Sequence, residues 1–326
     1  MNIKKIGMTA LAASLVSTSV FAGELTATGA ASITVENYSG LNIDAGKAFS
    51  MADSVTLNGS TELDNGMTVS MSFELDGGDV AAAGSYDSHS MTVSSDALGT
   101  LVFAGHGGST AVSAIDATAA GDVFDNFDGK VGTAESSSAA GDAAMLSTAG
   151  GNNIMLYTLP SLVDGLSVSA SYTPQGATLE SSTAYAATYT GVEGLSVSYG
   201  QGTNNAGAVA FHADVMTMKA SYAYGPITIG YSDHDFDSST NTRDQDTKSY
   251  SVAYTLTDSI SVTYGTEDMT TGEDSTSDAK YTKLSASYTT GGLTLSGNRQ
   301  TADNISYGTA ATEDQDYWGL TLGFAF

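Results

Sequence analysis

Apolar and polar residues alternate with a period of two along most of the chain beyond residue 24. Alternation at this period predicts β-strands that have one apolar and one polar face. The alternation is strict in residues 67–75, and Asn65-Gly66 just before it is a strong signal for a tight hairpin turn. The apolar residues of the first run are Leu25, Ala27, Ala31, Ile33 and Val35, and those of the run at 67–75 are Met67, Val69, Met71, Phe73 and Leu75.

The connections between these runs are alternately short and long. Short turns such as Asp164-Gly165 and Thr257-Asp258 alternate with longer polar segments, of which 233–247, 267–278 and 301–315 are predicted to be loops. Roughly sixteen runs of about eight to eleven residues have the length that a tilted strand needs to cross a bilayer. Short turns on one side and long loops on the other are typical of outer-membrane barrels, and an even strand count places both termini on the short-turn side.

The two faces of the runs differ in composition. Polar positions carry mostly Ser, Thr, Gly and Ala, which suit a crowded, wet lumen, and apolar positions carry aliphatic residues in mid-run and tyrosines at the ends. Aromatic residues at both ends match two interfacial girdles, although tyrosine also favours strands in general. No apolar run approaches the ~20 residues of a transmembrane helix. We therefore predict one all-β domain over residues 23–326, a closed transmembrane antiparallel β-barrel of about 16 strands. The tyrosines are Tyr172, Tyr199, Tyr231 and Tyr264 before long loops, and Tyr189, Tyr254 and Tyr288 near short turns.

Residues 105–153 are the one long segment that neither alternates like a strand nor closes like a tight turn. Long structureless segments inside a compact domain are usually functional or disordered. We predict that this segment folds into the lumen and narrows it. Its acidic residues are the candidates for the constriction, and they are Asp116, Asp122, Asp125, Asp128 and Glu135.

The first 22 residues predict a secretory signal peptide that is removed from the mature protein. Lys4 and Lys5 form a positive n-region, residues 6–16 form a short apolar h-region without acids, and Val20-Phe21-Ala22 is a small-x-small cleavage site. The alternative, a buried N-terminal helix, does not account for the three parts occurring in this order. The mature protein is therefore predicted to be exported.

Charge and composition narrow the function. The formal net charge of −26 argues against nucleic-acid binding, which relies on Lys and Arg neutralising phosphates. The chain has no Cys, which removes disulfides and thiolate metal sites. No Ser-His-Asp order, Gly-x-Ser-x-Gly elbow or phosphate-binding loop is present, so we do not expect an enzyme. Surface or loop roles are expected for the scattered histidines His89, His106, His212 and His234.

The acidic residues of segment 105–153 are also compatible with a calcium-binding loop. An EF-hand frame over residues 124–135 would place Phe124 at the first ligand position, where an acid is required, and no flanking helices are indicated. We therefore expect no cofactor, with looser calcium binding by the loop carboxylates left open.

The complete set of hairpins, with the terminal features, resembles the general trimeric porins of Gram-negative outer membranes, particularly the proteobacterial kind. Each hairpin alone is a weak signal, but the set covers the whole mature chain. The features are Val20-Phe21-Ala22 followed by Gly23-Glu24-Leu25, the hairpin at 164–172 echoed at 194–199, the long third loop after the fifth strand, and a final strand, 317–326, that ends in Phe326.

This resemblance implies an outer-membrane homotrimer through which small hydrophilic solutes and ions diffuse passively. It implies that the third loop makes an acidic constriction opposite basic residues of the wall. The final strand, with Trp318, Phe324 and Phe326, resembles the signal that the barrel-insertion machinery reads.

The acidic half of the constriction matches the family, but the basic half does not. Inward positions of the early strands carry acids and no Arg. An acidic lumen attracts cations and repels anions, so we predict a cation preference. The candidate residues of the lumen wall are Glu36, Glu62, Glu74, Lys219 and Lys283.

Two other functions fit parts of the sequence. Surface-layer and adhesin-like structural proteins are also exported, acidic and rich in small residues, but they usually show repeated domains with linkers. A substrate-specific barrel with a narrowed lumen would depend on how residues 105–153 fold.

Overall fold

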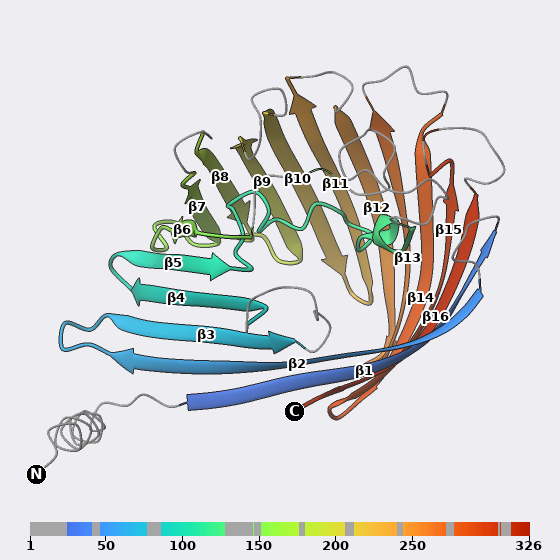
Figure 1. Cartoon of the computed structure of the whole chain (residues 1–326), viewed down its shortest axis with the longest axis horizontal. Coiled ribbons are helices and arrows are strands. Elements are labelled where there is room, and N and C mark those ends of the chain that lie inside the picture. Colours follow the sequence, from blue (N-terminus) through green and yellow to red (C-terminus); the bar gives the residue numbers. More distant parts are fainter. Residues whose placement is uncertain are drawn as a thin grey trace, which may run out of the picture.

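The computed structural model describes residues 25–40, 46–76, 86–127, 146, 151–175, 180–205, 212–239, 244–271, 277–305, 307 and 314–326. Within these residues the chain forms a closed barrel of sixteen strands, each antiparallel to its neighbours (Figure 1). The predicted fold class is therefore confirmed, whereas the predicted signal peptide lies outside the described residues. The strands are β1 (Leu25–Gly40), β2 (Gly46–Glu62), β3 (Thr68–Asp76), β4 (Ser88–Ser95), β5 (Gly99–His106), β6 (Ile154–Thr158), β7 (Leu166–Thr173), β8 (Ser182–Tyr189), β9 (Leu195–Asn204), β10 (Ala213–Tyr224), β11 (Ile227–Ser238), β12 (Gln245–Thr257), β13 (Ile260–Thr271), β14 (Ala279–Thr290), β15 (Leu293–Asp303) and β16 (Gln315–Ala325).

The alternation of side chains places the apolar positions on the outer face. On β11, Ile227, Ile229 and Tyr231 point outward, while the alternate residues Gly230 and Ser232 face the lumen. The outward apolar side chains remain exposed because no protein covers them. Such a surface suits the hydrocarbon of a bilayer, and closure of the sheet leaves no unpaired strand edge. No helix in the described part of the chain is long and apolar enough to cross a membrane.

The strands on the long-loop side continue further than predicted. β11 extends to Ser238, β12 begins at Gln245, β13 extends to Thr271 and β15 to Asp303, so the predicted loops 233–247, 267–278 and 301–315 were set too wide. In these extensions the pattern reverses, because the inner face is covered by another part of the chain and the outer face rises above the apolar band. On β11 the outward residues are Asp233, Asp235 and Asp237, and the buried inward residues are His234 and Phe236.

Two apolar clusters lie inside the barrel, where the segment after β5 packs against the wall. The short 3-10 helix η2 (Val123–Phe127) contributes three buried residues to one cluster. This packing explains why large apolar side chains occupy inward positions of several strands. The first cluster comprises Ala120, Val123, Phe124, Phe127, Met269, Ala279, Tyr281, Ala302, Ile305, Tyr307 and Tyr317, and the second Ala111, Val112, Ile115, Ala184, Ala186, Ala213, Val215 and Phe236.

The barrel closes where the last strand meets the first. β1 pairs with β16 in a register that places Ile33 opposite Leu322, so outward residues stand beside outward residues. Beyond the strand, the backbone of Phe326 donates to Gly29 O at 3.0 Å and accepts from Gly29 N at 2.9 Å. The Phe326 ring lies over Gly29, where a Cβ atom would come within 2.4 Å of it. The terminal aromatic residue is therefore part of the closing seam, and its role as an assembly signal stays a prediction.

Replacing Gly29 by Val is expected to destabilise the closed barrel by up to about 1 kcal/mol, because the new side chain displaces the exposed Phe326 ring from the seam. The measurement is the temperature at which the unboiled, folded band converts to the unfolded band on a denaturing gel. Gly59→Val on β2 is the matched control, since a Cβ atom there meets nothing within 4 Å. Equal conversion temperatures for the two variants would contradict the seam contact, whereas recovery in Gly29→Val/Phe326→Ala would support it.

Candidate functional site

The segment after β5 leaves the wall and crosses the interior of the barrel, as the green trace in Figure 1 shows. Its two limbs meet at a neck, where Gly108 N donates to Gly151 O at 2.8 Å and Gly151 N donates to Gly108 O at 3.0 Å. Gly107 and Gly151 have φ angles of +67° and +96°, which a residue with a Cβ atom rarely adopts. Beyond the neck the outgoing limb follows the inner wall to η2. The predicted position of the segment inside the lumen is therefore correct for the described residues 107–127.

Lys219 on β10 holds the first half of this limb. Its ammonium group pairs with the carboxylate of Asp116 and donates to Thr118 O at 2.8 Å. The predicted constriction residue Asp116 is thus bound to a predicted wall residue. A wall cation neutralises a loop acid here, so the pair adds little net charge to the lumen.

Ser249 on β12 and Glu267 on β13 hold the next part of the limb. The hydroxyl oxygen of Ser249 accepts from Ala119 N and Ala120 N, both at 2.9 Å. The fully buried carboxylate of Glu267 accepts from Val123 N at 2.9 Å and Phe124 N at 3.1 Å. The N–H groups at the start of a helix have no partner within it, so Glu267 caps η2 from the barrel wall on which η2 packs.

Two further contacts complete this anchorage. Lys283 on β14 donates to Gly121 O at 3.2 Å, and Asn126 Nδ2 donates to Gln300 Oε1 on β15 at 2.9 Å. Lys283 therefore binds a backbone carbonyl of the loop. It serves as an anchor and does not stand across the lumen from the loop as a basic counterpart.

The returning limb is held at Leu146. Leu146 N donates to Gln245 Oε1, and Leu146 O accepts from His234 Nε2, both at 2.7 Å. His234 Nδ1 then lies 2.7 Å from the hydroxyl of Thr217, which donates to it when the proton is on Nε2. The expected surface or loop role for His234 was wrong, because the side chain is buried on the inner face of β11.

The predicted loop acids lie as follows. Asp122 accepts from the Thr118 hydroxyl at 2.8 Å, and its backbone φ is +48°. Asp116, Asp122 and Asp125 are exposed, Asp128 and Glu135 lie outside the described residues, and no group of three or more His, Asp or Glu side chains in the described part of the chain could hold a metal ion.

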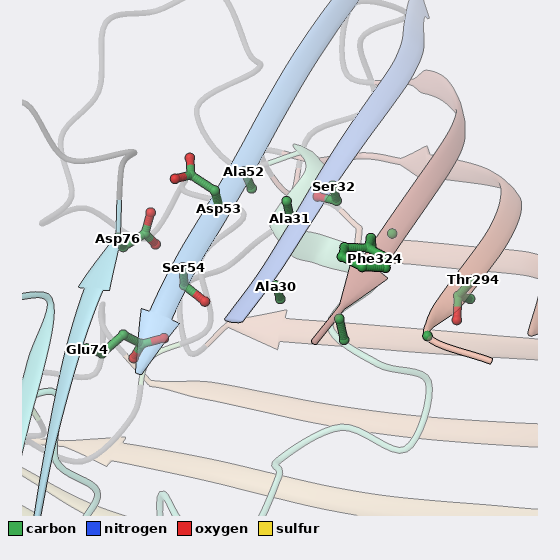
Figure 2. Close-up of a pocket in the computed structure, with 13 residues that line it drawn as sticks. Ala30, Ala31, Ser32, Ala52, Asp53, Ser54, Glu74, Asp76, Thr294 and Phe324 are labelled. Atoms are coloured by element: carbon green, nitrogen blue, oxygen red, sulfur yellow. The ribbon is translucent and has the colours of Figure 1, made fainter. Parts of the chain in front are cut away.

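The predicted wall acids lie on β1 to β3. Glu36 accepts from the Tyr317 hydroxyl and Glu74 from the Ser88 hydroxyl, both at 3.0 Å, while Glu62 is exposed at the end of β2. Close to the seam, Glu74 and Asp76 of β3 line a hollow of about 370 Å³. Figure 2 shows them beside Ser54 of β2.

The described basic residues are unevenly distributed between the two faces of the wall. The strand registers place Lys47, Lys248, Lys280 and Arg299 on the outer face. Lys219 and Lys283 are the inward lysines of the described chain, and both bind the loop. Among the described residues, the acids on β1 to β3 therefore face no lysine or arginine on the inner wall.

Ser249, Glu267, His234 and Gln245 hold the loop and were not predicted as functional residues. Glu267 was assigned to a loop because polar residues surround it in the sequence. The continuing period of two through 260–271 was the available signal, since it keeps Glu267 on the same face as Thr263 and Gly265.

Residues 7–282 match the family model of the Gram-negative porins. No curated protein matches the sequence.

Several solved structures similar to this chain are described as porins. A multiply substituted variant of the Rh. blastica porin has a TM-score of 0.66 and 18% identity, over 93% of this chain and 100% of that one. The anion-selective porin from Comamonas acidovorans has a TM-score of 0.67 and 18% identity with the same coverage. At 18% identity, the similarity to these structures concerns the fold alone. The family model, in contrast, matches residues 7–282 and therefore covers most of the sequence. On these grounds the chain belongs to the Gram-negative porin family.

Proposed function

We propose that this porin, a channel for passive diffusion, prefers cations and selects them at the passage between the anchored loop and the acidic wall of β1 to β3. The observation that carries the proposal is the position of Lys219 and Lys283, which both bind the loop from behind. Acids in a lumen with low-dielectric walls raise the local concentration of cations and lower that of anions.

The fold alone does not decide ion preference. The Comamonas acidovorans porin has a similar barrel and is described as anion-selective. Preference depends on which charges line the passage. In this chain those charges include Glu36, Glu74 and Asp76 of the wall and Asp122 and Asp125 of the loop.

The width of the passage depends on the anchorage of the loop. Buried N–H groups that lose their acceptor cost about 1–3 kcal/mol each. Ser249 accepts two such groups, so it has a large effect on the loop without changing the charge of the lumen.

We further propose that the chain assembles as a homotrimer through the outer face of β1 to β5. Within the strands, the outward tyrosines lie on β6 to β16, where Tyr157, Tyr222 and Tyr288 are examples. The outer face of β2 to β5 carries Met, Leu, Val and Phe, and Tyr86 before β4 contacts Phe73 of β3. Tyr and Trp are the usual membrane-interface anchors, and strands β1 to β5 carry neither of them on their outer face. The strand register also places Asp53 on this face beside Ala31, and a carboxylate at bilayer depth is disfavoured in lipid.

Neutralising the wall acids is expected to lower the cation preference. For Glu74→Gln/Asp76→Asn, the cation-to-anion permeability ratio is expected to fall about twofold or more, which corresponds to roughly 0.4 kcal/mol or more. The measurement is the reversal potential in a planar bilayer under a salt gradient. Asp237→Asn is the control, because this acid lies on the outer face and its neutralisation leaves the lumen unchanged. An unaltered ratio in the double variant would remove these acids from the selective passage.

Removing the Ser249 hydroxyl is expected to loosen the loop. Ser249→Ala leaves two backbone N–H groups without an acceptor, so single-channel recordings are expected to show extra conductance levels and greater open-channel noise. Ser251→Ala on the same strand is the matched control, since that luminal side chain makes no hydrogen bond to the described part of the loop. Records that do not differ between the two variants would contradict the anchoring role.

The proposed subunit face can be tested with single cysteines, because the native chain has none. Met91→Cys on β4 and Val252→Cys on β12 both place a thiol on the outer face. In folded protein in membranes, a lipid-soluble maleimide is expected to label Val252→Cys and to leave Met91→Cys largely unlabelled. Equal labelling of the two would mean that β4 faces lipid.

A further inference from the structure

A groove of about 430 Å³ lies on the outer face of β7 to β10. Its volume falls within the range of small-molecule sites, roughly 300–1,000 Å³. It lies on the arc that carries the outward tyrosines and away from the proposed subunit face. The side chains that matter here are Val168, Tyr185, Ala187, Tyr199, Thr203 and Asp214.

The groove is hollow because a small residue stands between large ones. Ala187 of β8 lies opposite Val168 of β7 and Tyr199 of β9 in the strand register. Tyr185 is the outward residue that precedes Ala187 on β8. It is 64% exposed and forms the second aromatic wall. The lower half is therefore an apolar trough flanked by two rings.

The upper half is polar and acidic. Thr203 lies opposite Asp214 of β10, and Asp214 lies opposite Asp237 of β11. Like charges directly opposite each other on a sheet are destabilising. Among the described residues neither Asp214 nor Asp237 forms an ion pair, and Lys248, the described cation on neighbouring β12, is paired with Asp246. This end of the groove therefore favours a positively charged group.

The groove runs from the apolar band of the barrel across the tyrosines to charged residues. This is also the order of groups in a membrane lipid, from acyl chain through the interface to the headgroup. An acyl chain lying between Tyr185 and Tyr199 would fill the trough and gain packing contacts with both rings. A primary ammonium at the headgroup would lie near Asp214 and Asp237.

We propose that this groove binds one acyl chain of a membrane lipid with an amine-bearing headgroup, whose ammonium group pairs with Asp214 and Asp237. The occupant is a lipid because this arc of the barrel carries the aromatic girdle and faces the bilayer. Its charge follows from Asp214 and Asp237 at the polar end, which form no ion pair with any residue in the described ranges. The proposal concerns the outer surface and does not depend on ion preference in the lumen.

Native mass spectrometry of the folded protein with two lipids of identical chains, phosphatidylethanolamine and phosphatidylglycerol, tests the proposal. We expect retained phosphatidylethanolamine with at least fivefold preference over phosphatidylglycerol. Asp214→Asn/Asp237→Asn is expected to abolish the preference while leaving binding of the chains. Ala187→Phe is expected to displace both lipids, because the new ring fills the trough.

Ala220→Phe on β10 is the matched control, since it adds the same ring to the outer face outside the groove. Tyr199→Ala removes one wall and provides a second variant if Ala187→Phe fails to fold, as judged by its unboiled band on a gel. Equal retention of the two lipids by the native protein, or undiminished retention by Ala187→Phe or Tyr199→Ala, would overturn the proposal. Disulfide-linked dimers formed by Ala187→Cys in membranes would also overturn it, because they would place a second copy on the groove.

Discussion

The structure depends on a simple constraint: backbone that leaves the wall and enters the barrel takes its N–H and C=O groups away from the sheet. These groups need new partners, because an unsatisfied buried group costs about 1–3 kcal/mol. The wall supplies them from side chains far away in the sequence. Ser249, Glu267, Gln245 and His234 each bond to loop backbone, and Lys219 and Lys283 bind loop carbonyls.

This constraint fixes the electrostatics of the passage. A lysine that is bound to the loop carbonyls cannot also stand across the lumen as a free counter-charge. The described inward lysines are both used in this way, so the acids of β1 to β3 have no basic residue facing them from the described inner wall. In the proposed function, the contacts that hold the loop would therefore also leave the lumen acids to attract cations.

The sequence was sufficient to predict the barrel, because lipid outside and water inside impose an alternation of apolar and polar residues on each strand. The runs at 67–75 and 227–231 were therefore assigned to the correct faces. The alternation did not predict strands in the regions where the outer face lies outside the lipid and the inner face is covered by the loop. Above Tyr231 the inner face packs on the loop and the outer face carries Asp233, Asp235 and Asp237, so these residues were taken for a loop.

The candidate site was only partly predictable. The length and acidity of residues 105–153 indicated a luminal loop, and Asp116, Asp122 and Asp125 lie exposed on its described part. Its anchors were not predictable, because Asp116 meets Lys219 across 103 residues and Val123 meets Glu267 across 144. Neither pairing has a local pattern, and an inward Lys or Glu on a strand does not reveal whether it faces the solution or the loop.

The most direct test of the proposed cation preference is the reversal potential of the unmodified protein in a planar bilayer with unequal salt on the two sides. A cation-preferring pore is expected to give stepwise openings and a reversal potential of the corresponding sign, and a reversal potential of zero or of the opposite sign would contradict the proposed preference.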